Sequence, residues 1–156
     1  PKHILEIGTF TGYSALCLAE GLKKGGEIHT IDKNEELLQI QNKYFKKSNY
    51  RDNIFQYTMD ASIMLEKTNK KFDIIFLDAD KKNYVYYLNY IPNILNKNGI
   101  LIADNVLWYG KVLGKISEMD IETKAIHHFN KKLKNSKQFQ TIILPLRDGI
   151  SISIKL

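Results

Sequence analysis

The chain contains one cysteine, one tryptophan and three prolines among its 156 residues, and it has no long apolar segment. A single thiol, Cys17, cannot form an internal disulfide, which suits a reducing compartment and predicts a cytoplasmic protein. No apolar run approaches the roughly 20 residues that a membrane-spanning helix needs, so we expect no membrane contact. The first residues lead directly into strand-like sequence, and no secretory signal is predicted.

Hydrophobic residues make up 44% of the chain and charged residues 26%, which is typical of a folded globular protein. The length supports one hydrophobic core, so residues 1–156 are predicted to form one domain. A net charge of +6 and a pI of about 9.2 are compatible with an acidic partner such as a nucleic acid. The lysines are scattered, however, and those at 131, 132 and 134 complement the dipole of an expected helix. We interpret the charge as limited support for an anionic substrate.

Strand-like and helix-like segments alternate along the chain. The expected strands are residues 3–7, 27–31, 53–58, 72–78, 99–104, 138–145 and 149–156. Compact apolar runs among the first five are typical of parallel strands that helices cover on both faces, and the more polar third strand is predicted at an edge. Only residues 146–148 separate the last two strands, and so short a connection joins antiparallel strands. The pattern predicts an α/β fold whose sheet is mostly parallel and ends in an antiparallel hairpin.

Several residues predict where the helical segments begin or are interrupted. Pro92 is predicted to interrupt the helix that begins near Tyr84. Asp120 is predicted at the start of the last helix, because an acidic first turn and a basic last turn suit its dipole. Cys17, beside Leu16 in an early helix, is expected to be buried and inert.

The first candidate site lies where the first strand ends. Gly8 would let a ligand approach the backbone and Gly12 would permit a tight turn before a helix that begins near Tyr13. The segment is neither G-x-G-x-x-G nor a phosphate-binding loop, which disfavours dinucleotides and triphosphates. Asp32 at the end of the second strand is placed to accept hydrogen bonds from ribose hydroxyls, or alternatively to cap the next helix. Together these features favour an adenosine-type ligand.

The second candidate site joins two strands that are distant in the sequence. Asp78 ends the fourth strand, and Asp104 with Asn105 ends the fifth. Because adjacent parallel strands lie about 4.8 Å apart, their carboxyl ends can bring these side chains around one point. Two carboxylates and an amide oxygen suit magnesium, manganese or calcium rather than structural zinc. The alternative for each aspartate alone is a helix cap.

Six stretches of the chain, taken in order, resemble one family. They are residues 6–14 (EIGTFTGYS), 31–32 (ID), 60–61 (DA), 78–84 (DADKKNY), 104–108 (DNVLW) and 145–149 (PLRDG). The chain is similar over nearly its whole length to the cation-dependent O-methyltransferases, which include the catechol and caffeoyl-CoA enzymes. The resemblance implies a Rossmann-like class I methyltransferase sandwich with a seven-stranded sheet, and residues 1–156 as its S-adenosylmethionine-dependent domain.

The resemblance also implies a role for each matching residue. The cofactor S-adenosylmethionine would be bound by Glu6, Gly8, Thr9, Ser14, Asp32, Asp60, Ala61 and Asp80. A divalent cation, expected to be Mg²⁺ with Mn²⁺ or Ca²⁺ as alternatives, would be held by Asp78, Asp104 and Asn105. Lys81 matches a proposed general base, the alternative being a solvent-facing lysine at a helix start.

The same resemblance implies that Tyr87, Trp108 and Tyr109 would lie near the methyl acceptor. Tyr87 matches a tyrosine near the substrate of plant relatives, but its helical spacing fits core packing equally well. Tyr109 replaces an asparagine that contacts substrate in the plant enzymes, which puts a caffeoyl-CoA specificity in doubt. The N-terminal helices of the family are expected to be absent from this chain, which would leave the cofactor pocket partly open and cofactor binding weak. The full-length protein is expected to be a homodimer, as in the family.

Three hypotheses for function follow. In the first, the chain methylates a metal-chelated hydroxyl of a catechol-like or related small molecule. The second keeps the chemistry but places the hydroxyl on a modified uridine in transfer RNA. The third is a NAD-dependent dehydrogenase or a non-catalytic nucleotide-binding module, disfavoured by the missing G-x-G-x-x-G and by the intact carboxylate set.

Overall fold

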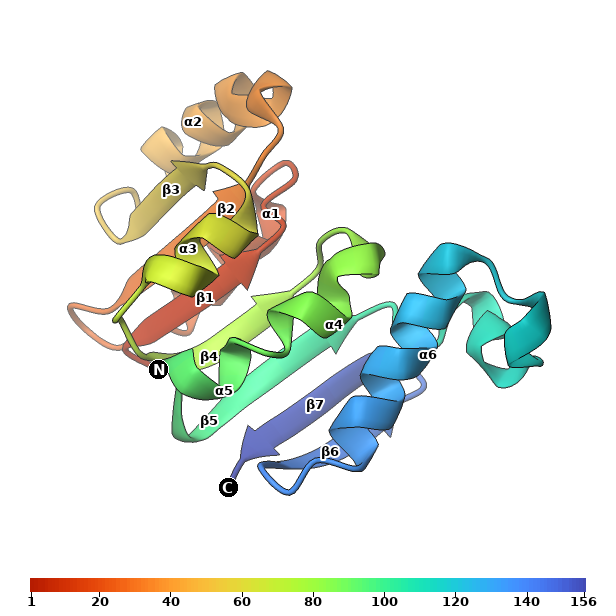
Figure 1. Cartoon of the computed structure of the whole chain (residues 1–156). Helices are drawn as coiled ribbons and strands as arrows, with labels where there is room; N and C mark the ends of the chain where they lie inside the picture. The colour runs from red at the N-terminus through yellow and green to blue at the C-terminus, as the bar shows by residue number, and fades with distance from the viewer.

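The computed structural model describes all 156 residues, which form a seven-stranded sheet in the order β3-β2-β1-β4-β5-β7-β6 (Figure 1). Neighbouring strands pair in parallel from β3 to β5, whereas β7 runs antiparallel to both β5 and β6. The predicted α/β class and the antiparallel hairpin are therefore confirmed. The strands are β1 (His3–Ile7), β2 (Glu27–Asp32), β3 (Ile54–Thr58), β4 (Phe72–Leu77), β5 (Leu95–Asp104), β6 (Phe139–Leu144) and β7 (Ile150–Lys155).

The strand predictions are wrong by more than one residue only at β5. This strand begins at Leu95 rather than at residue 99, because Leu95 already pairs with Phe72 before an irregularity in the register. The polar strand β3 lies at the edge of the sheet, as predicted. There it needs only one ladder partner and buries few side chains.

Six helices and four short 3₁₀ turns connect the strands. Pro92 stands at the start of α5 and separates it from α4, which confirms the predicted interruption. Asp120 caps α6 by accepting a hydrogen bond of 2.7 Å from the Thr123 N–H. The helices are α1 (Tyr13–Glu20), α2 (Leu38–Lys47), α3 (Ala61–Lys67), α4 (Tyr84–Tyr87), α5 (Ile91–Ile94) and α6 (Ile121–Lys134), and the 3₁₀ turns are η1 (Glu35–Leu37), η2 (Lys81–Asn83), η3 (Trp108–Leu113) and η4 (Ile116–Glu118).

Apolar side chains form a core on each face of the sheet. Helices α3 to α6 lie over one face, as Figure 1 shows, and contribute to a cluster of 22 buried residues. On the other face a smaller cluster joins α1 and α2 to Ile4 and Ile28. Consecutive residues of β1 therefore serve different cores, since Leu5 belongs to the large cluster and Ile4 to the small one.

The prediction for Cys17 is wrong. Ala15 and Ala19 are the residues of α1 that face the sheet, and Cys17, two positions from each, lies exposed on the opposite side of the helix. None of the helices combines the length and the apolar character that crossing a membrane requires.

Candidate functional site

The turn after β1 is built around Gly8, which has a φ of +104°. A Cβ on this residue would lie 2.0 Å from the Asp78 carbonyl oxygen, so only glycine lets the end of β1 pass the end of β4. The turn closes with Gly12 at a φ of +85°, immediately before α1. The tight turn predicted at Gly12 is therefore confirmed, and Gly8 allows a close packing of β1 against β4 that the sequence did not reveal.

Glu6 and Thr9 lie beneath this turn rather than at its surface. Glu6 is fully buried and accepts a hydrogen bond from the Thr30 hydroxyl, and the Thr30 and Thr9 hydroxyl oxygens lie 2.5 Å apart. Glu6 Oε1 has no hydrogen-bond partner. Burial raises the pKa of Glu6 to about 7, against an ordinary value of 4.5, although the nearby hydroxyls of Ser14 and Thr30 oppose the shift. The chain thus keeps a carboxyl group with spare acceptor capacity below the Gly8 turn.

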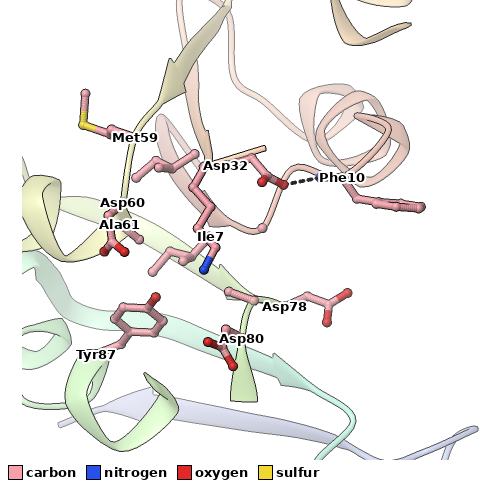
Figure 2. Close-up of a pocket in the computed structure, with 13 residues that line it drawn as sticks. Ile7, Phe10, Asp32, Met59, Asp60, Ala61, Asp78, Asp80 and Tyr87 are labelled. Atoms are coloured by element: carbon pink, nitrogen blue, oxygen red, sulfur yellow. Dashed lines mark hydrogen bonds between the residues drawn. The ribbon is translucent and has the colours of Figure 1, made fainter. Parts of the chain in front are cut away.

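Asp32 fastens the same turn from the neighbouring strand. One of its carboxylate oxygens accepts the Phe10 N–H at 2.8 Å, drawn as a dashed line in Figure 2, and the other accepts the Asn34 N–H at 2.9 Å. The cap of the next 3₁₀ turn is Asn34 itself, whose side chain accepts the Glu36 N–H. Capping is therefore not the role of Asp32, which holds the loop and lines a pocket.

This pocket has a volume of about 310 Å³ and lies at the carboxyl ends of β1, β2 and β4; it is called the cofactor-side pocket because most of the residues predicted for the cofactor line it. Asp60 caps α3 by accepting the Ser62 N–H at 2.8 Å, and Asp80 accepts the Lys82 N–H at 3.2 Å. Figure 2 shows Asp60 and Asp80 near the Tyr87 ring, whereas the Asp78 side chain points away from it. Five of the eight residues predicted for the cofactor line the pocket, namely Gly8, Asp32, Asp60, Ala61 and Asp80.

The charge of this pocket distinguishes between ligand classes. Four aspartates, Asp32, Asp60, Asp78 and Asp80, line it together with one cation, Lys33. An acidic lining opposes the phosphates of a dinucleotide and favours a ligand that carries positive charge and hydroxyl groups. S-Adenosylmethionine has both, in its sulfonium, its amino group and its ribose.

A second pocket, of about 620 Å³, contains the predicted cation ligands and Tyr109, one of the predicted acceptor residues, and is called the acceptor-side pocket. Asp78, Asp104 and Asn105 all line it, and they lie at the carboxyl ends of β4 and β5, where Leu77 pairs with Ala103. The Asn105 N–H donates to one carboxylate oxygen of Asp104 at 2.7 Å. No group of three histidine, cysteine, aspartate or glutamate side chains is arranged to hold a metal. A cation here would depend on two carboxylates and an amide, supplemented by other oxygen ligands.

Lys81 lies between the two strand ends. Its ammonium group donates to Asp78 Oδ1 at 2.8 Å and to the Tyr84 hydroxyl at 2.6 Å, and lies 3.5 Å from the Asp104 carbonyl oxygen. The Tyr84 hydroxyl in turn donates to the Leu77 and Asp104 carbonyls. Lys81 is only 7% exposed, so the alternative of a solvent-facing lysine is excluded. Burial raises the pKa of Tyr84 well above its ordinary value, so its hydroxyl stays protonated.

Of the remaining predicted residues, only some lie at the pocket where they were expected. Tyr87, expected near the acceptor, lines the cofactor-side pocket and is 4% exposed within the large core. Burial and the charges of Asp60 and Asp80 raise its pKa to about 12. Tyr109 lines the acceptor-side pocket, whereas Trp108 packs against the core. Ser14 is half-buried and lies outside both linings.

Arg147 and Asp148, for which the sequence predicted no role, line the acceptor-side pocket. Their position could have been found from topology. Since β6 runs antiparallel to β7 and β7 antiparallel to β5, the end of β6 reaches the same sheet edge as the end of β5. The loop after β6 therefore had to approach Asp104.

Comparison with known proteins identifies the family and the fold. The profile of a family described as O-methyltransferase matches residues 1–156. The chain belongs to the O-methyltransferase family. It is 31% identical over 163 residues to the tapetum-specific methyltransferase 1 of Arabidopsis thaliana and 29% identical over 165 residues to a caffeoyl-CoA O-methyltransferase of Populus kitakamiensis. Each alignment spans 99% of this chain and 70% of the relative.

The fold is also that of solved family structures. An O-methyltransferase from Bacillus cereus, determined in complex with S-adenosylhomocysteine (SAH), superposes with a TM-score of 0.90 at 25% identity. The match covers 99% of this chain and 74% of the bacterial enzyme. The predicted family, the Rossmann-like methyltransferase fold and the enzyme class are thereby confirmed.

Proposed function

We propose that residues 1–156 form one methyltransferase domain that transfers a methyl group from S-adenosylmethionine to a hydroxyl of a catechol-like or related small-molecule acceptor, with a divalent cation. The observation that carries this proposal is the position of Asp78, which lines both pockets. A methyl donor in one and a hydroxyl acceptor in the other would meet beside this residue. Holding two reactants in contact can supply about 7 to 11 kcal/mol of the barrier reduction in favourable cases.

The cofactor-side pocket offers partners for the ribose, the adenine and the amino group of the proposed methyl donor. Asp32 would accept from the ribose hydroxyls, and Asp60 with Ala61 would border the adenine. Asp80 would contact the amino group, supported by its place on the pocket wall. The unpartnered oxygen of Glu6 provides a further acceptor below the turn, and binding of a cationic ligand above it would favour the ionised carboxylate. The SAH complex of the Bacillus cereus relative supports this choice of cofactor.

The acceptor-side pocket suits a divalent cation by the chemistry of its donors. Asp78, Asp104 and Asn105 would hold it, since they offer hard oxygen ligands at one sheet edge. Lys81 uses only Oδ1 of Asp78, so the other carboxylate oxygen is free to bind. When bound, such a cation lowers the pKa of a coordinated hydroxyl and fixes its direction.

Lys81 is the residue that we propose as general base. Its nitrogen lies within hydrogen-bond distance of Asp78 and is held by the Tyr84 hydroxyl, so its position is set before an acceptor arrives. A lysine accepts a proton only as the neutral amine, and a second cation close by favours that form. Lys81 would then take the hydroxyl proton, and the acceptor oxygen would attack the methyl carbon in line with the departing sulfur.

The proposal is tested with Asp104→Asn, which keeps the size of the side chain and removes its charge. Calorimetric titration with Mn²⁺ and Mg²⁺ should show at least about tenfold weaker cation binding, as expected when a ligand is impaired. S-Adenosylmethionine binding should change little, and methylation of a catechol panel should fall with cation affinity. Asp52→Asn, an exposed aspartate far from the site, serves as the control. Unchanged cation binding in Asp104→Asn would contradict the cation assignment.

The salt dependence of acceptor binding distinguishes a small-molecule acceptor from transfer RNA. Contacts to RNA phosphates release counterions, so binding of hydroxyuridine-containing transfer RNA would weaken steeply as salt increases. Binding of an uncharged catechol should depend little on salt. Methylation of the transfer RNA with no turnover of any catechol would overturn the small-molecule proposal.

A further inference from the structure

A positively charged side chain, that of Arg147, lines the acceptor-side pocket, and the proposed reaction gives it no role. Arg147 lines this pocket together with Asp78 and Asp104, and it takes part in none of the salt bridges of the chain. The guanidinium is always charged and presents a planar set of donors that matches a carboxylate. Arg147 is exposed, so its guanidinium is open to a negatively charged group on a ligand in this pocket.

Asp148, the neighbour of Arg147, forms no salt bridge with it. One carboxylate oxygen of Asp148 accepts the Tyr109 N–H at 2.5 Å, and its carbonyl accepts the Leu107 N–H at 2.9 Å. A further bond of 3.0 Å joins the Val106 N–H to the Gly149 carbonyl. These three bonds fasten the loop after β6 to the loop after β5, so Arg147 is carried by a fixed turn.

The two loops around this pocket are held in a costly conformation. Four of the six non-glycine residues with positive φ lie here, namely Asn105 at 59°, Trp108 at 47°, Tyr109 at 55° and Arg147 at 50°. Such a conformation is strained for a residue with a Cβ and persists only where its surroundings enforce it. A glycine at position 147 would relieve the strain but would remove the charge from the pocket. The presence of arginine rather than glycine at this strained position therefore suggests a role for its charge.

We propose that Arg147 selects the methyl acceptor by binding a carboxylate on it, so that the preferred substrates are aromatic diols that carry a carboxylate. This inference rests on the proposed function. A divalent cation would bind Asp78 and Asp104, and Asp148 forms no salt bridge with Arg147, which leaves the guanidinium donors of Arg147 for the ligand. The volume of about 620 Å³ is that of a small-molecule site.

A small carboxylate fits this pocket better than an RNA backbone does. Arg147 is the only cationic residue in its lining, whereas binding along a phosphate backbone requires several. Tyr109 is 82% exposed at the same pocket and offers an aromatic surface for the ring of the acceptor. The guanidinium would bind the carboxylate while the two hydroxyls face the strand ends.

The test compares two acceptors that differ by one carboxylate, catechol and 3,4-dihydroxybenzoate. Arg147→Asn removes the charge and keeps a residue that tolerates a positive φ, and Arg147→Lys keeps the charge. Arg147→Asn should lower the preference for 3,4-dihydroxybenzoate over catechol about tenfold in kcat/KM, as expected for the loss of a charge-assisted hydrogen bond. The change should lie in KM for the carboxylated acceptor, and Arg147→Lys should retain part of the preference.

Calorimetric binding of both acceptors, with SAH and Mg²⁺ present, gives a readout that does not require turnover. Arg51→Asn, at the only other arginine, makes the same change in net charge far from the pocket and should leave the preference unaltered. An equal effect of Arg147→Asn on both acceptors, or no effect, overturns the role of Arg147. Selective binding of the carboxylate without methylation of either acceptor contradicts the proposed function and supports the anion site, whereas binding of neither contradicts both.

Discussion

Glu6 should make the stability of this protein fall as the pH rises through neutrality. The side chain is fully buried and one of its oxygens has no partner, and burial raises its pKa to about 7 from an ordinary 4.5. Between these two values the folded state keeps the proton while the unfolded chain releases it. The folded state then binds more protons, so the free energy of unfolding decreases with pH over this window and levels off above it.

The size of the effect follows from the shift in pKa. At 1.36 kcal/mol for each unit, a change from 4.5 to about 7 corresponds to a loss of roughly 3 kcal/mol, most of it between about pH 5 and pH 7.5. Glu6→Gln resembles the protonated acid and cannot ionise. We therefore expect the variant to lack this loss, so that the difference in stability between variant and wild type grows with pH by about that amount.

Urea denaturation in a series of buffers from about pH 5 to pH 8, followed by circular dichroism, measures the difference directly. Subtracting the wild-type curve removes contributions that both proteins share. Glu20→Gln, at an exposed position on α1, is the matched control and should follow the wild type. If the Glu6→Gln curve ran parallel to the wild-type curve at all pH values, the burial argument for Glu6 would be refuted.

Two further substitutions test other parts of the structure. Gly8→Ala would place a Cβ 2.0 Å from the Asp78 carbonyl oxygen at a φ of +104°. We therefore expect the free energy of unfolding in urea to fall by at least about 2 kcal/mol and calorimetry to show loss of cofactor binding. Normal stability and binding would show that the turn can move. Burial lowers the pKa of His29, so the wild type should lose stability as the pH falls below 6.5. His29 stacks on Phe55, and His29→Phe keeps an aromatic ring there but cannot take up a proton, so it should lose less stability. Thermal melts at about pH 5 and pH 7.5 compare the two proteins, and an equal fall in both would contradict the prediction.

Local patterns in the sequence were sufficient to predict the order of the strands and helices. Apolar runs such as that of β4, the Pro92 interruption and the acid-to-base polarity of α6 act within a few residues of the chain, so they can be read from it directly. The short connection between β6 and β7 also determined their antiparallel pairing, because too few residues are present for a crossover.

Only the tertiary structure decided how individual side chains are used. Cys17 was predicted buried from its helical spacing, but which face of α1 meets the sheet depends on packing against β1 and β2. Tyr87 turned toward the cofactor-side pocket, and Lys81 is buried between two strand ends rather than in solvent. Arg147 lines the same pocket as Asp104, from which it is more than forty positions away in the sequence, because β6 and β5 end at one edge of the sheet. Periodicity describes neighbours along the chain, whereas pockets are made by residues that only the sheet brings together.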